Sequence, residues 1–142
     1  MKKLVFILVL GLLFSCEDDV GLERCGLLGS LNPEIIGVWV EEGYEDDALV
    51  LNSAAELDQN KYGFVLHEDG SFVERKNSGW CATPPISYAN YDGRWRALSD
   101  SLLDIVVGYW GGSVSYQIRI LGLDDKQLRI RYLYGEEREN TR

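Results

Sequence analysis

The sequence predicts an all-β protein, a small antiparallel up-and-down β-barrel of about eight strands. Short apolar runs separated by turn residues follow one another along most of the chain, and no long stretch keeps the spacing of an amphipathic helix. The last two apolar runs alternate between apolar and polar positions, as strands with one buried and one wet face do. Short hairpins between such strands favour a meander, and closing the meander into a barrel removes its exposed edges.

The chain begins with the features of a secretory signal. Lys2 and Lys3 precede an apolar run over residues 4–14, which is shorter than the roughly 20 residues of a transmembrane helix. The run ends in the letters LFSC, with Cys16 last. This ending resembles a bacterial lipobox, in which the cysteine accepts a diacylglycerol and becomes the first residue of the mature chain. Residues 1–15 are therefore predicted to be a lipoprotein signal peptide; the alternative is an ordinary secreted protein with a chance cysteine.

Three acids, Glu17, Asp18 and Asp19, follow the cysteine directly. They resemble the acidic surface-export signal of Bacteroidetes lipoproteins, which implies a protein anchored to the outer membrane by lipid and facing the cell exterior; the alternative is the inner leaflet of the outer membrane. The plainer interpretation is a solvated tether, since acids with few apolar neighbours cannot form a core. We predict a lipidated acidic tether and lead-in over residues 16–34 and the barrel domain over residues 35–142.

Charge limits the partners of the mature chain. Removal of residues 1–15 leaves 127 residues, with 12 Lys and Arg against 23 Asp and Glu, a formal charge of −11. This balance argues against nucleic acid, whose phosphates need basic patches, and against direct binding to anionic lipid headgroups. The length is sufficient for one domain.

Two cysteines remain besides Cys16, namely Cys25 and Cys81. An even pair in an oxidising compartment predicts a disulfide, which would close a loop of about 57 residues and contribute roughly 4 kcal/mol. A metal site and a catalytic thiol are the alternatives. The two cysteines and the single histidine, His67, lack the spacing of metal ligands, so neither a metal nor a cofactor is expected.

The first half of the barrel domain carries four strand signals. Apolar residues bounded by turn residues predict strands over 35–41, 48–51, 62–67 and 71–76. Residues 53–58 are expected to form a helical turn. The letters EDG at residues 68–70 predict a tight hairpin turn between the third and fourth strands.

The second half carries four more, over residues 88–98, 102–107, 113–120 and 127–134. Turns are expected at residues 99–100, 108–112 and 122–126, and the charged residues 135–142 are expected to fray. In the last two strands one face is apolar and the other polar. The apolar positions are Val114, Tyr116, Ile118, Ile120, Leu128, Ile130, Tyr132 and Tyr134.

Several of these segments together resemble the lipocalin-like domains of Bacteroidetes lipoproteins. The letters IIGVWV carry a Gly37-x-Trp39 motif like the strand entry of lipocalins, and LHEDGSFV, YDGRW, SLLDIVV and a final hairpin follow in the same order. The resemblance covers roughly residues 35–134. It implies a ligand-binding barrel in which Trp39 plugs the closed end beneath an arginine from a late strand, with Arg119, Arg129 and Arg131 as the candidates.

The chain also departs from the lipocalin pattern. It has no second motif in mid-chain, is shorter than a typical lipocalin and shows no helical pattern at its C-terminus. A short barrel can fill its interior with its own side chains. Ligand binding inside the barrel and a filled barrel therefore both remain open.

Catalysis is not expected. His67 is placed beside a predicted turn, no serine lies in a G-x-S-x-G elbow, and no carboxylate spacing indicates an acid/base pair. An acidic cluster is conceivable as a calcium loop but lacks the spacing of an EF-hand, so a solvated loop is preferred. The cluster comprises Glu41, Glu42, Glu45, Asp46 and Asp47.

Aromatic residues are the best candidates for contact with a ligand or partner. Those in predicted loops either anchor a ligand or partner or fold over a barrel end, and those on apolar faces are either core or pocket lining. The candidates are Trp80, Trp95, Tyr109, Trp110, Tyr116 and Tyr132. Two functions follow as expectations. One is non-catalytic binding of a small apolar or amphipathic molecule, and the other is a filled barrel that contacts an envelope protein.

Overall fold

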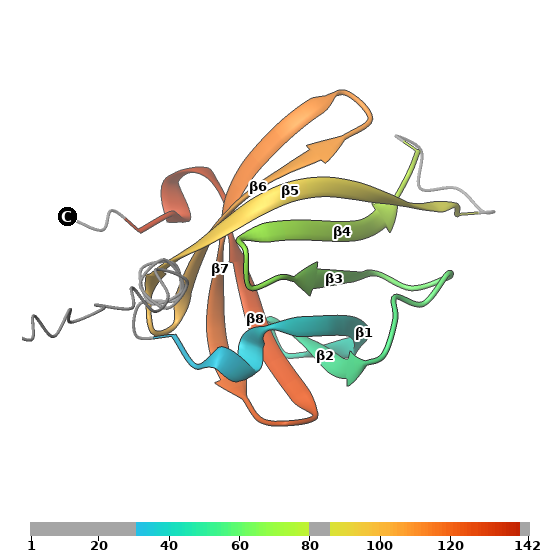
Figure 1. Ribbon diagram of the computed structural model, residues 1–142. Coiled ribbons are helices and arrows are strands. Elements are labelled where there is room, and N and C mark those ends of the chain that lie inside the picture. Colours follow the sequence, from blue (N-terminus) through green and yellow to red (C-terminus); the bar gives the residue numbers. More distant parts are fainter. Residues whose placement is uncertain (1–30, 80–85, 140–142) are drawn as a thin grey trace, which may run out of the picture.

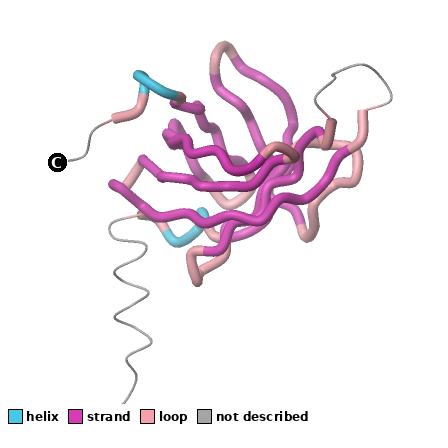
Figure 2. The backbone as a smooth tube through the Cα atoms, turned by 90° about the horizontal axis from the view of Figure 1, so that it is seen from above, coloured by secondary structure: helices cyan, strands magenta, loops and turns pink. Residues whose placement is uncertain are grey.

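Eight antiparallel strands and two short 3-10 helices make up residues 31–79 and 86–139, the part of the chain that the computed structural model describes (Figure 1). Figure 2 shows that strands form nearly all of this backbone, with the two short helices at its edges. In chain order the elements are η1 (Pro33–Ile35), β1 (Gly37–Glu45), β2 (Ala48–Ala54), β3 (Gly63–Leu66), β4 (Ser71–Asn77), β5 (Tyr88–Ser99), β6 (Leu102–Tyr109), β7 (Gly112–Leu123), β8 (Gln127–Leu133) and η2 (Gly135–Glu137).

The strands close into a barrel in the cyclic order β1-β2-β8-β7-β6-β5-β4-β3. From β3 to β8 each strand pairs with the next one along the chain, and β8 closes the barrel on β2. The predicted antiparallel eight-stranded barrel is therefore confirmed. One detail was not foreseen: β1 lies between β2 and β3, so residues 55–62 must carry the chain past β1.

This crossover is held by one arginine on β4. The Nη1 atom of Arg75 donates hydrogen bonds to the carbonyl oxygens of Leu57, at 3.1 Å, and Asp58, at 3.0 Å. Gly63, where β3 begins, permits β3 to approach β1 closely, since a Cβ there would lie 2.6 Å from the carbonyl oxygen of Trp39. The expected helical turn at residues 53–58 is wrong: β2 continues to Ala54 and the following residues form the crossover.

One end of the barrel is closed by apolar side chains and by η1. Asn32 caps η1 by accepting a hydrogen bond from the Glu34 backbone N–H, and Pro33 supplies the fixed φ that suits a first helical position. The strand predicted from residue 35 therefore begins only at Gly37. Ile35 enters the core, where its carbonyl accepts the indole N–H of Trp39 at 2.8 Å.

Trp39 is buried in the core cluster at this end, and its plugging role stays a prediction. The three arginines that the resemblance offered alternate with inward-facing residues and lie on the outer face. Each forms an ion pair there: Arg119 with Glu139, Arg129 with Glu45 and Arg131 with Asp47.

Large apolar side chains fill the interior at the closed end and through its middle. The alternation in β7 and β8 directs one face of each strand inward, as the sequence predicted. Members of the core cluster that are at most 3% exposed include Trp39, Leu51, Phe64, Leu66, Phe72, Trp95, Leu103, Ile105, Ile118, Leu128 and Ile130.

Up to Glu139, the C-terminal segment packs against the outer face of β6 and β7. The expected fraying is therefore wrong for residues 135–139. The carboxylate of Asp104 accepts from Arg96 at 3.0 Å and from Arg138 at 2.6 Å. The side-chain amide of Gln117 bonds both the backbone N–H and the carbonyl of Glu139. Side chains on the polar, outward face of these strands thus bond a segment that is distant in sequence. No local sequence pattern predicts such contacts.

Candidate functional site

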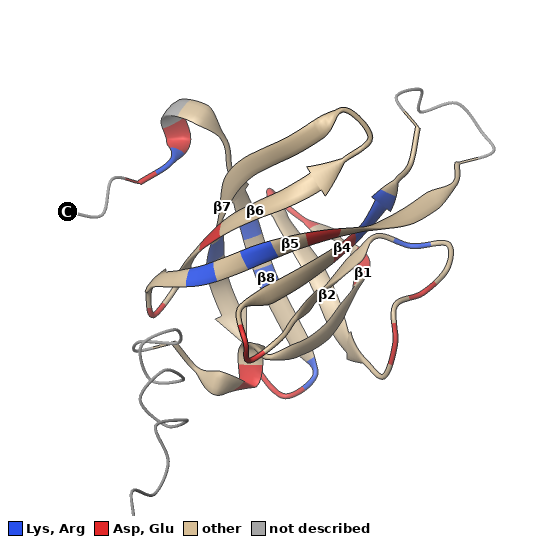
Figure 3. Cartoon of the chain, turned by 45° about the horizontal axis from the view of Figure 1, so that its top comes forward, with Lys and Arg blue, Asp and Glu red and all other residues tan. Residues whose placement is uncertain are grey.

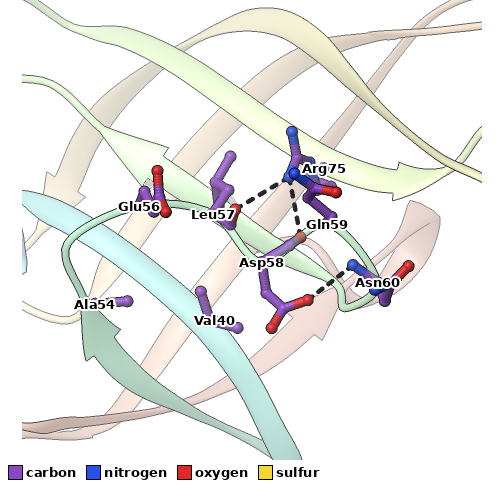
Figure 4. A pocket seen from close by; sticks show the side chains of 8 residues that line it. All are labelled: Val40, Ala54, Glu56, Leu57, Asp58, Gln59, Asn60 and Arg75. Carbon is purple, nitrogen blue, oxygen red and sulfur yellow. Dashed lines mark hydrogen bonds between the residues drawn. The ribbon is translucent and has the colours of Figure 1, made fainter.

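One hollow on the described surface lies outside the barrel, beneath the crossover. It has a volume of about 580 Å³, and its lining is mostly polar (Figure 4). Two of the polar side chains are used within the chain: Arg75 holds the crossover and also bonds the Asn90 side chain at 2.7 Å, while Asp58 accepts a hydrogen bond from the backbone N–H of Asn60. This hollow lies along the seam between the crossover and the barrel wall.

A second hollow, of about 290 Å³, lies inside the barrel at the end opposite η1. We call it the tyrosine cup. It is small, at about the lower limit of ligand pockets, and it combines five aromatic rings with one acid and one base. Its lining residues are Tyr44, Leu49, Tyr62, Glu74, Lys76, Val114, Tyr116, Tyr132 and Tyr134.

Strand register explains why these side chains meet. Glu74 on β4 shares the inward face with Phe72, because the two are separated by one residue. Tyr116 on β7 likewise shares the inward face with Ile118. A bulge in β1 between Glu41 and Gly43 shifts the register by one residue, so that Tyr44, opposite Leu49, also faces the interior.

The base of the cup is a buried carboxylate with three donors. Glu74 is 4% exposed. Its Oε1 accepts from the Tyr62 hydroxyl at 2.8 Å and from the Tyr116 hydroxyl at 2.9 Å, and its Oε2 lies 2.5 Å from the Lys76 ammonium. Because the Tyr62 hydroxyl donates to Glu74, the hydrogen bond between Tyr62 and Tyr132 is donated by Tyr132. These contacts satisfy the buried charge, as such burial requires.

The tyrosine rings pack on one another above the carboxylate. Tyr132 stacks on Tyr134 with centroids 5.9 Å apart and an interplanar angle of 23°. Tyr116 meets Tyr132 edge-on at 5.3 Å, and Tyr62 meets Tyr132 edge-on at 6.4 Å. Tyr134 is 53% exposed and Tyr44 is 69% exposed, so these two rings form the rim that a ligand would meet first.

Burial keeps the inner phenols neutral. Removal from water raises the pKa of Tyr62, Tyr116 and Tyr132 well above the usual 10.0, and the nearby Glu74 carboxylate raises each pKa further. The pKa of the half-buried Tyr134 is also raised, again chiefly by burial. At neutral pH the cup therefore holds neutral phenols around one ion pair.

Of the five predicted aromatic residues that the structure describes, Tyr116 and Tyr132 line the cup. Trp95 belongs to the core, where its indole N–H donates to the carbonyl of His67 at 2.9 Å. Tyr109 and Trp110 lie at the β6–β7 turn, are 38% and 64% exposed, and contact each other edge-on. The β6–β7 hairpin projects beyond the rest of the barrel (Figure 1).

The remaining predicted site residues lie outside the described part of the chain. They are the lipidation site Cys16, the export residues Glu17, Asp18 and Asp19, the disulfide pair Cys25 and Cys81, and the loop residue Trp80.

The sequence analysis missed the residues at the centre of the cup. Glu74 and Lys76 follow Phe72 at alternate positions, so the alternation of β4 already placed an acid and a base on the inward face. Two charges on a buried face are the signal that was available. Tyr44 could not be found in this way, because the β1 bulge changes the side it faces.

Comparison with protein-family models, with curated proteins and with solved structures found no match to this chain. Within residues 31–79 and 86–139, no helix has the length and apolar character needed to cross a membrane. The same residues contain no group of three or more His, Cys, Asp and Glu side chains placed to hold a metal ion.

Proposed function

We propose that this chain is a lipid-anchored bacterial lipoprotein that binds a small amphipathic molecule in the tyrosine cup without catalysis. The observation that carries the binding proposal is Glu74, a buried carboxylate held by phenol hydroxyls at the base of an opening lined with aromatic rings. Ligand pockets combine apolar walls with a few placed polar groups in this way. The filled closed end restricts the ligand to the cup, so a long apolar chain is not accommodated.

The proposed cellular location depends on the first nineteen residues. The basic start, the short apolar run and Cys16 are the parts that a lipoprotein signal needs, and the three acids after Cys16 favour the outer surface of the outer membrane. Resemblance to lipocalin-like lipoproteins supports the same assignment through the Gly37-x-Trp39 entry and the barrel fold.

A second candidate function is a protein-interaction module. It is favoured by the filled closed end of the barrel and by the exposed aromatic pair Tyr109 and Trp110 on the projecting β6–β7 hairpin. Exposed aromatic residues are frequent anchors of protein interfaces. In that case the cup is part of the fold and holds no ligand.

Native mass spectrometry of the intact chain, extracted from membranes of its own organism, tests both parts. A covalent mass that survives denaturation and disappears in Cys16→Ala would support the lipid anchor. A second mass that leaves on denaturation would support ligand binding. Absence of the covalent mass, or its persistence in Cys16→Ala, would contradict the anchor.

Two matched variants place the bound mass. We expect Tyr134→Ala, on the rim of the cup, to remove it and Trp110→Ala, on the hairpin, to retain it. The opposite result would move the binding site from the cup to the β6–β7 turn. A bare protein mass in the unmodified chain would count against the ligand proposal.

A further inference from the structure

The tyrosine cup already holds an ammonium group. The Nζ atom of Lys76 lies 2.5 Å from Oε2 of Glu74 and 5.3 Å from the centroid of the Tyr91 ring. The Lys76 side chain is 22% exposed, whereas that of Glu74 is 5% exposed. The base of the cup therefore binds a cation between a carboxylate and an aromatic face, and the cation is attached to the protein by a flexible stem.

The groups that remain available to a ligand favour positive charge. The hydroxyl hydrogens of Tyr62 and Tyr116 are both committed to Glu74, so these phenols have no hydrogen left to donate to an anion. Besides the Lys76 ammonium and the hydroxyls of the rim residues Tyr44 and Tyr134, the cup offers carboxylate oxygen and the faces of tyrosine rings, whose quadrupole attracts cations. The stacked pair Tyr132 and Tyr134 supplies two such rings beside the opening.

Lys76 is suited to leave this position. Its side chain is more exposed than that of its partner and originates at the mouth, close to the end of β4 at Asn77. A long lysine stem can carry its ammonium to water. A departing lysine would leave Glu74 as a buried, uncompensated charge, which is costly, unless another cation takes its place.

We propose that the tyrosine cup selects small organic cations, such as a primary amine or a quaternary ammonium carrying apolar groups. The ligand's cationic head takes the position of the Lys76 ammonium against Glu74, and its apolar groups lie against the rings of Tyr132 and Tyr134. Lys76 thus neutralises Glu74 in the empty protein and is displaced on binding. This inference rests on the proposed function, since it names the ligand class of the same site.

A pair of probes that differ only in charge tests the selection. Choline and its neutral isostere, in which a quaternary carbon replaces the nitrogen, are titrated separately into the intact chain. Binding is followed by NMR through shifts of the tyrosine ring resonances. We expect choline to bind at least about tenfold more tightly than the isostere. Equal affinities would overturn the cation inference while leaving amphiphile binding at the cup in place.

Variants test the mechanism with matched controls. Glu74→Gln keeps the shape and an oxygen acceptor for the two phenols but removes the charge, and we expect it to abolish the preference for choline. Glu56→Gln, on the exposed crossover beside the outer hollow, changes the net charge equally and should keep the preference. Loss of the preference in both variants would mean that long-range charge, and not the cup, selects the cation.

Lys76→Met retains most of the stem and removes the competing ammonium. If Lys76 is displaced by the ligand, this variant should bind choline several-fold more tightly than the unmodified chain. Weaker binding in a folded Lys76→Met protein would show that Lys76 supports the cup and is not displaced. Absence of any shift with either probe would overturn this inference, whereas the bound mass in native spectrometry decides the proposed function independently.

Discussion

At the scale of single residues, the fold depends on how Glu74 is satisfied. A carboxylate that is 4% exposed would destabilise the barrel if it lacked donors, because desolvation of an ion costs several kcal/mol. Two phenol hydroxyls and one ammonium provide those donors from β4, from β7 and from the residue before β3. The polar cluster therefore ties together strands that are distant in sequence, and it does so at the end of the barrel that apolar side chains leave open.

We expect Tyr116→Phe to lower the free energy of unfolding by about 1.5–3 kcal/mol, because it removes a hydrogen bond to a buried charged group. The ring and its contact with Tyr132 remain in the variant, so the loss reports on the hydroxyl. Urea denaturation measures the change. Tyr109→Phe is the matched control: Tyr109 is exposed at the β6–β7 turn, and its replacement should alter stability by less than about 0.5 kcal/mol. Equal losses in the two variants would contradict the role given to the buried network.

At the scale of strands, the sequence was most informative where one face is buried and the other is wet. The alternation in β7 and β8 predicted both strands and their inward residues, including Tyr116 and Tyr132 of the cup. The EDG turn was also correct, and Gly70 there has a φ of 81°, which suits glycine. Local patterns of this kind are set by the two-residue repeat of a strand, so they survive in any fold that buries one face.

What the sequence did not reveal depends on contacts between distant segments. The order of β1, β2 and β3 requires the crossover, which Arg75 holds, and neither feature has a local pattern. The register shift in β1 turns Tyr44 toward the cup, although alternation from Trp39 would have placed Tyr44 outside. Pattern reasoning therefore reached Tyr116 and Tyr132, whereas Tyr44 required the register.

The pairing of β5 with β6 offers a test at this scale. Gly93 lies opposite Val107, and a Cβ at this position would come within 2.4 Å of the carbonyl oxygen of Val106 and 2.9 Å of the Cα of Val107. Because both atoms belong to the backbone of the partner strand, the two strands would have to separate. We expect Gly93→Ala to lower the free energy of unfolding by about 1–3 kcal/mol, measured by urea denaturation.

Gly122→Ala in β7 is the matched control for that measurement. A Cβ at Gly122 would have nothing within 4 Å, so alanine there should be neutral or stabilising by up to about 1 kcal/mol through the unfolded chain. If Gly93→Ala proved as harmless as Gly122→Ala, the close approach of β5 and β6 would be wrong.

At the scale of the whole molecule, the barrel has two ends of different character. Side chains fill the end closed by η1, whereas the opposite end keeps the tyrosine cup. Outside, Figure 3 shows Lys and Arg positions scattered among Asp and Glu positions over the strands and turns of this view. The chain as a whole carries a formal charge of −9. Charge of this sign is consistent with steering of cations and unfavourable for polyanions.

The buried phenols should make the whole barrel less stable at alkaline pH. The pKa values of Tyr62, Tyr116 and Tyr132 are all raised well above 10.0 in the folded protein, chiefly by burial. In the unfolded chain these phenols ionise near pH 10, so above that pH the unfolded state holds fewer protons than the folded state. The slope of unfolding free energy against pH is then negative. We expect stability from these groups to be complete below about pH 9 and to fall above about pH 10, by up to about 1.4 kcal/mol per pH unit for each phenol.

Urea denaturation between about pH 8 and pH 11 measures this slope, and tyrosinate absorbance identifies its source. The chain has eight tyrosines, and the three buried phenols of the cup, those of Tyr62, Tyr116 and Tyr132, should ionise only as the barrel unfolds. Tyr132→Phe removes one of the shielded phenols and should make the slope shallower, whereas Tyr109→Phe should leave the slope unchanged. If all eight tyrosines titrated together near pH 10 without loss of structure, the phenols would be open to water, and the enclosed network around Glu74 would be wrong. A steep slope that persists in Tyr132→Phe would instead assign the alkaline sensitivity to groups outside the cup.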